Sequence, residues 1–158
     1  ELISLTAFYK LIKNPISRIE VASAGGYLSY ENIADKATVA GVEVEVRKNL
    51  FVRPLSSAAN GMNKLSFGLN GSYIYTNAKM PLATVTTGSQ LEGAAPWIAN
   101  FDLSHNFTKG THSFINTLVF NYVSDKIYTI GTQGYQDIME QGMMTLDFVS
   151  QAKLNKYV

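Results

Sequence analysis

The sequence has no cysteine, and charged residues make up only 16% of its 158 positions. The absence of cysteine excludes disulfides and thiolate metal sites. Soluble domains carry about 25% charged residues, so the low share points away from an ordinary soluble surface. Lys and Arg number 13 against 12 Asp and Glu, and no basic patch or stripe stands out. We therefore expect no nucleic-acid partner, which would need such a patch.

Long apolar runs and catalytic motifs are missing as well. No segment approaches the roughly 18 consecutive apolar residues of a membrane-spanning helix. The sequence contains no Gly-x-Ser-x-Gly elbow, no His-Glu-x-x-His, no P-loop and no spaced glycine fingerprint. We therefore expect no catalytic residue, no cofactor and no enzymatic activity.

In place of these features, the sequence has long stretches in which apolar and polar residues alternate. In the segment Lys64–Thr76, one set of alternate positions reads Leu65, Phe67, Leu69, Gly71, Tyr73 and Tyr75. The other set is polar or small except at Ile74. A period of two indicates a β-strand with one apolar and one polar face. A strand of this length, with tyrosines at one end, is long enough to cross a membrane.

The same alternation predicts six strands, with a short extended piece at Ile16–Val21 after the first of them. The strands are expected at Leu2–Ile12, Thr38–Lys48, Lys64–Thr76, Pro96–Phe107, Ser113–Tyr128 and Met143–Asn155. The charged residues placed on their polar faces are Glu43, Glu45, Arg47, Asp102, Asp147 and Lys153. These charges suit either a polar lumen or ordinary cross-strand pairing. We expect no charge on the apolar faces, since Arg or Lys facing lipid at mid-depth costs about 2–4 kcal/mol.

The connections between these strands differ in length in a regular way. Those at 22–32, 78–95 and 131–142 are long, the one at 49–63 is moderate, and Thr108–Thr111 is a tight hairpin turn with a glycine. Up-and-down transmembrane barrels have short turns at one end and long loops at the other. We therefore predict that the three long connections emerge together, opposite the two shorter ones.

Two fold classes fit this pattern. Soluble β-sandwiches also alternate, but their turn signals recur every 8–12 residues or so, whereas here they are separated by strands of eleven residues or more. We favour an all-β fold of antiparallel up-and-down strands forming part of a transmembrane β-barrel. The alternative is a soluble all-β binding module, such as one for carbohydrate. A β-rich enzyme has no supporting set of residues.

Several segments, taken in order, add a resemblance to this pattern. Phe8–Ile16 has a tyrosine-containing strand that ends in Lys-Asn-Pro-Ile, and Gly41–Lys48 reads Gly-Val-Glu-Val-Glu-Val-Arg-Lys. Leu91–Asn100 begins Leu-Glu-Gly-Ala-Ala-Pro-Trp, with Glu92 where glutamine is usual, and Asn121–Asp147 completes the set. In this order, over essentially the whole chain, the segments resemble the C-terminal barrel region of TonB-dependent outer-membrane receptors.

The resemblance implies a wall fragment of a bacterial outer-membrane receptor, which binds a nutrient outside the cell and imports it with energy delivered through TonB. Residues 1–158 would form a single partial barrel segment, about six strands of about 22. The plug domain, the remaining strands and the closing C-terminal strands would lie elsewhere in a longer protein. The implied partners are outer-membrane lipid, the rest of the barrel and the plug, TonB indirectly, and a nutrient of unknown type.

Aromatic side chains give the candidate binding residues. Tyr27, Tyr30 and Tyr135 lie in the long connections, where loop aromatics contact sugars or siderophores, although local packing is the alternative. His105 and His112 flank the tight turn without a Cys or carboxylate cluster, so we expect no metal site there. Aromatics near strand ends suit a girdle at a membrane interface. These are Tyr9, Tyr73, Tyr75, Trp97, Phe107 and Tyr122.

Overall fold

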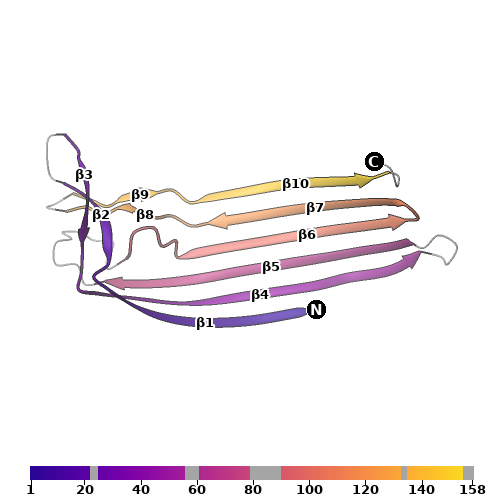
Figure 1. The fold of residues 1–158 in the computed structure, drawn as a ribbon, viewed down its shortest axis with the longest axis horizontal. Coiled ribbons are helices and arrows are strands. Elements are labelled where there is room, and N and C mark those ends of the chain that lie inside the picture. The colour runs from indigo at the N-terminus through magenta and orange to yellow at the C-terminus, as the bar shows by residue number, and fades with distance from the viewer. Residues whose placement is uncertain (22–24, 56–60, 79–89, 133–134, 155–158) are drawn as a thin grey trace.

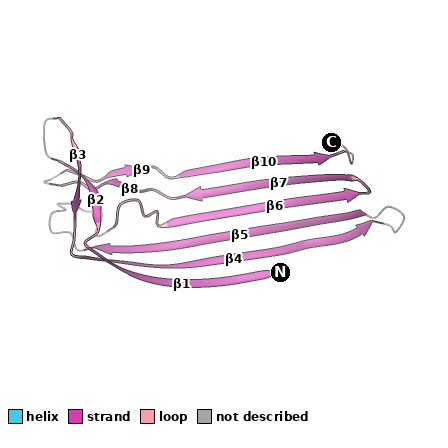
Figure 2. Cartoon of the chain, in the orientation of Figure 1, coloured by secondary structure: helices cyan, strands magenta, loops and turns pink. Residues whose placement is uncertain are grey.

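The structure, a computed structural model, describes residues 1–21, 25–55, 61–78, 90–132 and 135–154. The strands are β1 (Leu2–Lys13), β2 (Ile16–Glu20), β3 (Leu28–Asn32), β4 (Lys36–Leu55), β5 (Gly61–Ala78), β6 (Trp97–Lys109), β7 (His112–Val123), β8 (Lys126–Thr129), β9 (Ile138–Glu140) and β10 (Met143–Lys153). Figure 2 shows no helix among them, and the described residues hold none long and apolar enough to span a membrane. The all-β prediction is confirmed.

Six long strands form one antiparallel sheet in the order β1-β4-β5-β6-β7-β10. β2 pairs with β3 and β8 with β9, as two small hairpins at one end of this sheet (Figure 1). We call this the loop end, because the chain leaves β1, β5 and β7 there. The opposite, turn end carries the β4–β5 and β6–β7 connections, as predicted. In the β6–β7 turn, Gly110 has a φ of +59°, the conformation that the tight hairpin requires.

The predicted facing of the strands is confirmed by their register. Leu69 lies opposite Val46 on β4 and Phe101 on β6, and directly opposed residues in an antiparallel pair share a face. The apolar face therefore carries Val42, Val44, Val46, Leu65, Phe67, Leu69, Phe101 and Leu103. One position along, Asn70 lies opposite Glu45 on β4 and Asn100 on β6. The polar face therefore carries these three residues together with Glu43 and Asp102.

β4 is longer than predicted because a β-bulge interrupts the alternation. The register shifts between Asn49 and Phe51, so Lys48 and Phe51 both lie on the apolar face. Because the alternation changes phase at this shift, a period-two pattern does not predict that the strand continues to Leu55. Pro54 is tolerated because β4 has β5 as its only described neighbour there. Lys48 also corrects the expectation of a charge-free apolar face, and its long stem makes the position tolerable.

The predicted strand Ser113–Tyr128 was wrong beyond Val123. Ser124 accepts a hydrogen bond from the Trp97 N–H at Oγ (3.0 Å), and Asp125 accepts one from the Gly142 N–H (2.5 Å). These side chains interrupt the ladder, and β8 starts a separate hairpin at Lys126. β3 and β9 likewise lie in stretches predicted as loops.

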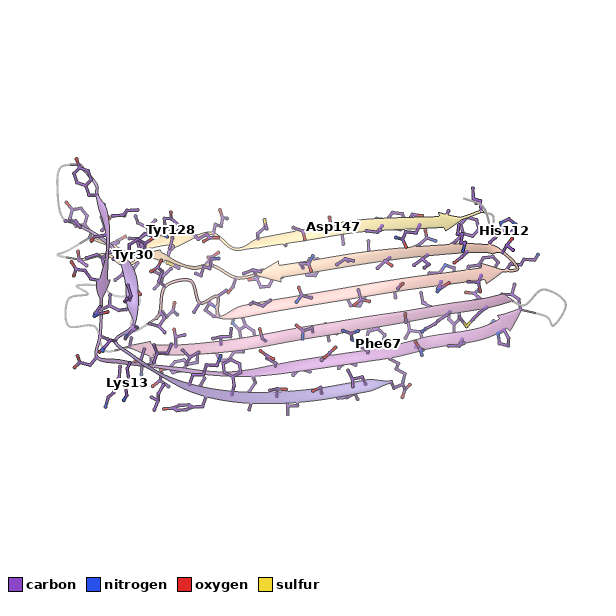
Figure 3. The ribbon with its side chains drawn as sticks, in the orientation of Figure 1. Lys13, Tyr30, Phe67, His112, Tyr128 and Asp147 are labelled. Carbon is purple, nitrogen blue, oxygen red and sulfur yellow. The ribbon has the colours of Figure 1, made fainter. Side chains whose placement is uncertain are left out.

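Burial is concentrated in the loop-end hairpins, not under the sheet. The described buried cluster contains Ile19, Ile33, Ala34, Ala37, Ala78, Leu91, Ile127 and Ile130. On the apolar face of the sheet, by contrast, Ile3 is 81% exposed and Phe148 is 68% exposed. Figure 3 shows Phe67 and Asp147 along the sheet, well away from that cluster. Within the described residues, no second layer covers the apolar face.

Ile74, the exception in the alternation of β5, has a local explanation. Its position is opposite Gly41, which in turn lies opposite Phe8 on β1. A Cβ added at Gly41 would lie 2.4 Å from the ring of Phe8 and 2.7 Å from the carbonyl oxygen of Tyr73. Glycine therefore makes room for Phe8 beside Ile74, in a small apolar patch on the polar face.

We predict that Gly41→Ala destabilises the sheet by about 1–3 kcal/mol, because a backbone oxygen cannot move aside as a flexible side chain does. Gly71→Ala is the matched control, since the nearest atom to its added Cβ is the Ile98 carbonyl oxygen at 3.9 Å. Urea denaturation of the folded protein measures both. Equal losses of stability in the two variants would contradict the crowding at Gly41.

Candidate functional site in the loop-end hairpins

Arg18 occupies the centre of the loop-end hairpins. On β2 it lies directly opposite Tyr30 of β3, and its Nη2 is 3.3 Å from the Tyr30 hydroxyl. Its Cζ is 4.3 Å from the ring centroid of Tyr128, on β8, and 5.7 Å from that of Tyr30. Figure 3 shows the two labelled tyrosines gathered at this end of the molecule. The guanidinium thus contacts aromatic rings from two different loop hairpins.

Glu92 brings a third connection to the same arginine. Its Oε2 accepts a hydrogen bond from the backbone N–H of Arg18 (2.5 Å), and its Oε1 lies 3.9 Å from Nε. The two side chains are only 21% and 19% exposed, so solvent screens this ion pair less than a surface pair. The hydrogen bond to Tyr30 raises the pKa of Arg18 above its usual value, against the opposing effect of burial. Arg18 is therefore cationic at every physiological pH, and Glu92 is its counter-ion within the site.

Backbone contacts join the three connections around this cluster. Ile19 and Ile130 form a parallel bridge, with the Ile130 N–H donating to the Arg18 carbonyl (3.0 Å). The Gly93 N–H donates to the Ile127 carbonyl (2.9 Å), and Thr132 Oγ1 donates to the Glu20 carbonyl (2.7 Å). Segments more than 70 residues apart therefore form one hydrogen-bonded unit.

The predicted ligand tyrosines are distributed unequally. Tyr30 is part of the Arg18 cluster and remains 64% exposed, so its ring has a free surface. Tyr27 and Tyr135 are exposed, and within the described residues neither has a hydrogen bond or ring contact with Arg18. The sequence pattern does not single out Arg18, and it places Tyr128 in a sheet strand instead of a loop hairpin. Glu92, which stands where glutamine is usual in the family, was the one sign in the sequence of an unusual charge in these loops.

The two histidines lie at different levels of the β6–β7 hairpin. His105 lies opposite Asn116 and His112 opposite Lys109, so their backbone positions are about 13 Å apart along the strands. His105 Nε2 instead bonds Asn63 Oδ1 at 2.8 Å. Within the described part of the chain, no three His, Cys, Asp or Glu residues are grouped as metal ligands.

The polar face holds a separate cavity of about 320 Å³ towards the turn end. Its charged lining includes Arg47, Lys64 and Asp102. Asp102 extends over Gly68, where an added Cβ would meet its Oδ1, and Arg47 Nε bonds Glu45 Oε1 at 2.6 Å. This face is therefore hydrophilic and charged, in contrast to the exposed apolar side chains behind it.

Comparison with known families decides between the two fold classes. A family model described as TonB-dependent receptor-like, β-barrel, matches residues 1–150. The chain belongs to this family. Searches of curated proteins and of solved structures found no match. For a TonB-dependent receptor barrel, the one-sided apolar sheet and the long loop hairpins are the expected architecture of a membrane wall.

We predict that Glu92→Gln destabilises the loop unit less than Glu92→Ala, because the amide oxygen can still accept the Arg18 N–H although the ion pair with the guanidinium is lost. Glu92→Ala leaves that N–H without its partner and should cost about 1–2 kcal/mol. Amide hydrogen exchange at Arg18 and Ile130 measures the effect, with Leu69 on β5 as the internal reference. Faster exchange in Glu92→Gln than in Glu92→Ala would refute this role for the carboxylate oxygen.

Proposed function

We propose that the chain is a wall segment of a bacterial outer-membrane receptor that imports a nutrient with energy from TonB. In this proposal the apolar face contacts lipid, the polar face lines the lumen, and the loop-end hairpins face the cell exterior. Residues 1–158 form one partial barrel segment. The plug domain and the other strands, including the closing ones, belong to a longer protein. The segment binds and transports and performs no catalysis.

The observation that carries this proposal is a single sheet with one continuous exposed apolar face. From Tyr75 to Leu65 the apolar positions of β5 span about 33 Å of strand, or about 25 Å of depth at a tilt near 40°. That depth equals the apolar band of outer-membrane barrels. At the loop end of this band the rings of Tyr73 and Trp97 are 4.5 Å apart, which suits an interfacial girdle.

The edges of the sheet support a larger barrel. β1 pairs only with β4, and β10 only with β7, among the described strands. An open edge leaves backbone N–H and C=O groups unpaired, which lipid cannot satisfy. Additional strands must therefore flank β1 and β10 in the membrane. A soluble binding module would instead need a second layer over Ile3, Leu5 and Phe148, all of which are exposed.

The Arg18 cluster supports ligand recognition at the outer mouth. Tyr30 and Tyr128 remain 64% and 43% exposed around the largely enclosed Arg18, and these flat rings with their hydroxyl groups suit a nutrient with ring or chelate groups. We propose Tyr30 and Tyr128 as contacts, with the exposed Tyr27 and Tyr135 as further contacts. The plug would contact the polar face near Arg47 and Asp102, and TonB would act through the plug.

Charge insertion tests which face contacts lipid. Leu69→Lys places an ammonium in the middle of the apolar band, where it should cost about 2–4 kcal/mol, whereas Asn70→Lys faces the lumen and should be tolerated. The intact receptor, refolded into lipid vesicles and titrated with urea, measures both. A larger loss for Asn70→Lys would reverse the assignment of the two faces.

Exchange of connections tests the transport role. Replacing the loop-end connections of the intact receptor with those of a related receptor should change which nutrient supports growth. Replacing the β4–β5 and β6–β7 turns should leave that preference unchanged, because those turns lie at the opposite end. Outer-membrane fractionation and radiolabelled uptake are the measurements. A change of preference from the turns alone would contradict the proposed orientation.

A further inference from the structure

The apolar face carries charge of one sign. Its charged strand residues are Lys13, Lys36, Lys48, Arg53 and Lys109. The carboxylates of the same six strands, Glu43, Glu45, Asp102 and Asp147, all lie on the polar face. Lys13 and Lys36 oppose each other at the loop end, Arg53 and Lys109 lie at the turn end, and Lys48 lies opposite Phe67, inside the turn-end part of the apolar band.

A line of hydrogen-bonding side chains crosses the apolar face, between the level of Lys48 and that of Lys109. Arg53 lies opposite Asn63, whose Oδ1 bonds His105 Nε2 (2.8 Å). His105 lies opposite Asn116, whose Oδ1 accepts from the Ser150 hydroxyl (2.7 Å). We call Asn63, His105, Asn116 and Ser150 the polar belt. It runs across β5, β6, β7 and β10, between the apolar band and the turn end.

We propose that this turn-end surface binds the headgroup of an anionic phospholipid of the inner leaflet, with phosphatidylglycerol as the representative. The inference rests on the proposed function, which gives the apolar face to lipid and the turn end to the periplasm. Arg53 and Lys109 supply the charge for the phosphate, and the long stem of Lys48 lets its ammonium reach towards it from inside the band. The polar belt supplies hydrogen-bonding groups at the level of the glycerol esters, and the band beyond it contacts the acyl chains.

Charge complementarity identifies lipid as the occupant. Arg53 extends over the Phe51 ring, with its Cζ 5.8 Å from the ring centroid, so an apolar ring and a cation are presented side by side. The carboxylate nearest these cations is Glu1, whose Oε1 is 3.5 Å from Lys48 Nζ in an exposed pair that contributes little. Only an amphiphile with an anionic head and apolar chains complements both the cations and the adjoining band.

The test uses the intact receptor in neutral detergent, with equimolar phosphatidylglycerol and phosphatidylethanolamine of identical acyl chains. Native mass spectrometry counts each bound lipid. The triple variant Lys48→Gln/Arg53→Gln/Lys109→Gln should lose most of the preference for phosphatidylglycerol, at about fivefold per cation. The matched control Arg47→Gln/Lys64→Gln/Lys153→Gln removes the same charge from the polar face and should keep the preference. A parallel sample with excess inorganic phosphate should not displace the lipid.

The other outcomes overturn the inference in distinct ways. If the unmutated intact receptor shows no preference for phosphatidylglycerol, the inference is overturned. This result does not depend on whether the triple variant folds. Equal losses in both triple variants would show non-specific attraction to net charge. Displacement by inorganic phosphate would show a free-anion site. A receptor that does not reach the outer membrane would instead refute the proposed function, whereas one inserted without lipid preference refutes only this inference.

Discussion

Cross-strand hydrogen bonding, with no second layer over the described strands, is the constraint on which the rest of this structure depends. The ladders of β1, β4, β5, β6, β7 and β10 pair the backbone of six strands, but the register of a ladder is not fixed by the backbone alone. A slip of one residue at Leu69 would place Asn70 beside Val46 and reverse every side chain of β5. The alternation has energetic meaning only if the two faces meet different solvents, and in the proposed orientation lipid on one face supplies that difference.

The hairpins at the loop end obey a different rule, because they leave the membrane and must bury their own apolar groups. Ile19 and Ile130 achieve this by pairing across more than a hundred residues of sequence. Arg18 and Glu92 then add polar contacts to the same cluster. For the proposed recognition role these contacts matter, because they hold Tyr30 and Tyr128 in place before a ligand binds, which lowers the entropic cost of binding.

Period-two alternation predicted the six sheet strands, their facing and the ends at which they connect, since these properties follow from local sequence. It failed at Leu50, which has no partner on β5. Because of this extra residue, Phe51 lies on the apolar face, but apolar and polar residues no longer alternate in the sequence. It failed again at Ser124, whose interruption of β7 depends on contacts with Trp97 from another strand. The Arg18 cluster was not predictable from alternation for the same reason, because residues 18, 92 and 128 are far apart in the sequence and meet only in the tertiary structure.

The sign of the charges on the apolar face follows from side-chain length. Lys and Arg have long apolar stems that lie along the band while the charged group reaches the headgroups, whereas Asp and Glu are too short to do so. At Lys48 and Arg53 a cation is therefore tolerated near the end of the band, while a carboxylate such as Asp102 belongs on the wet face. Alternation thus decides which face a residue occupies, and stem length decides which charges that face accepts. In the proposed orientation, the two rules together place acids in the lumen and cations at the membrane boundary.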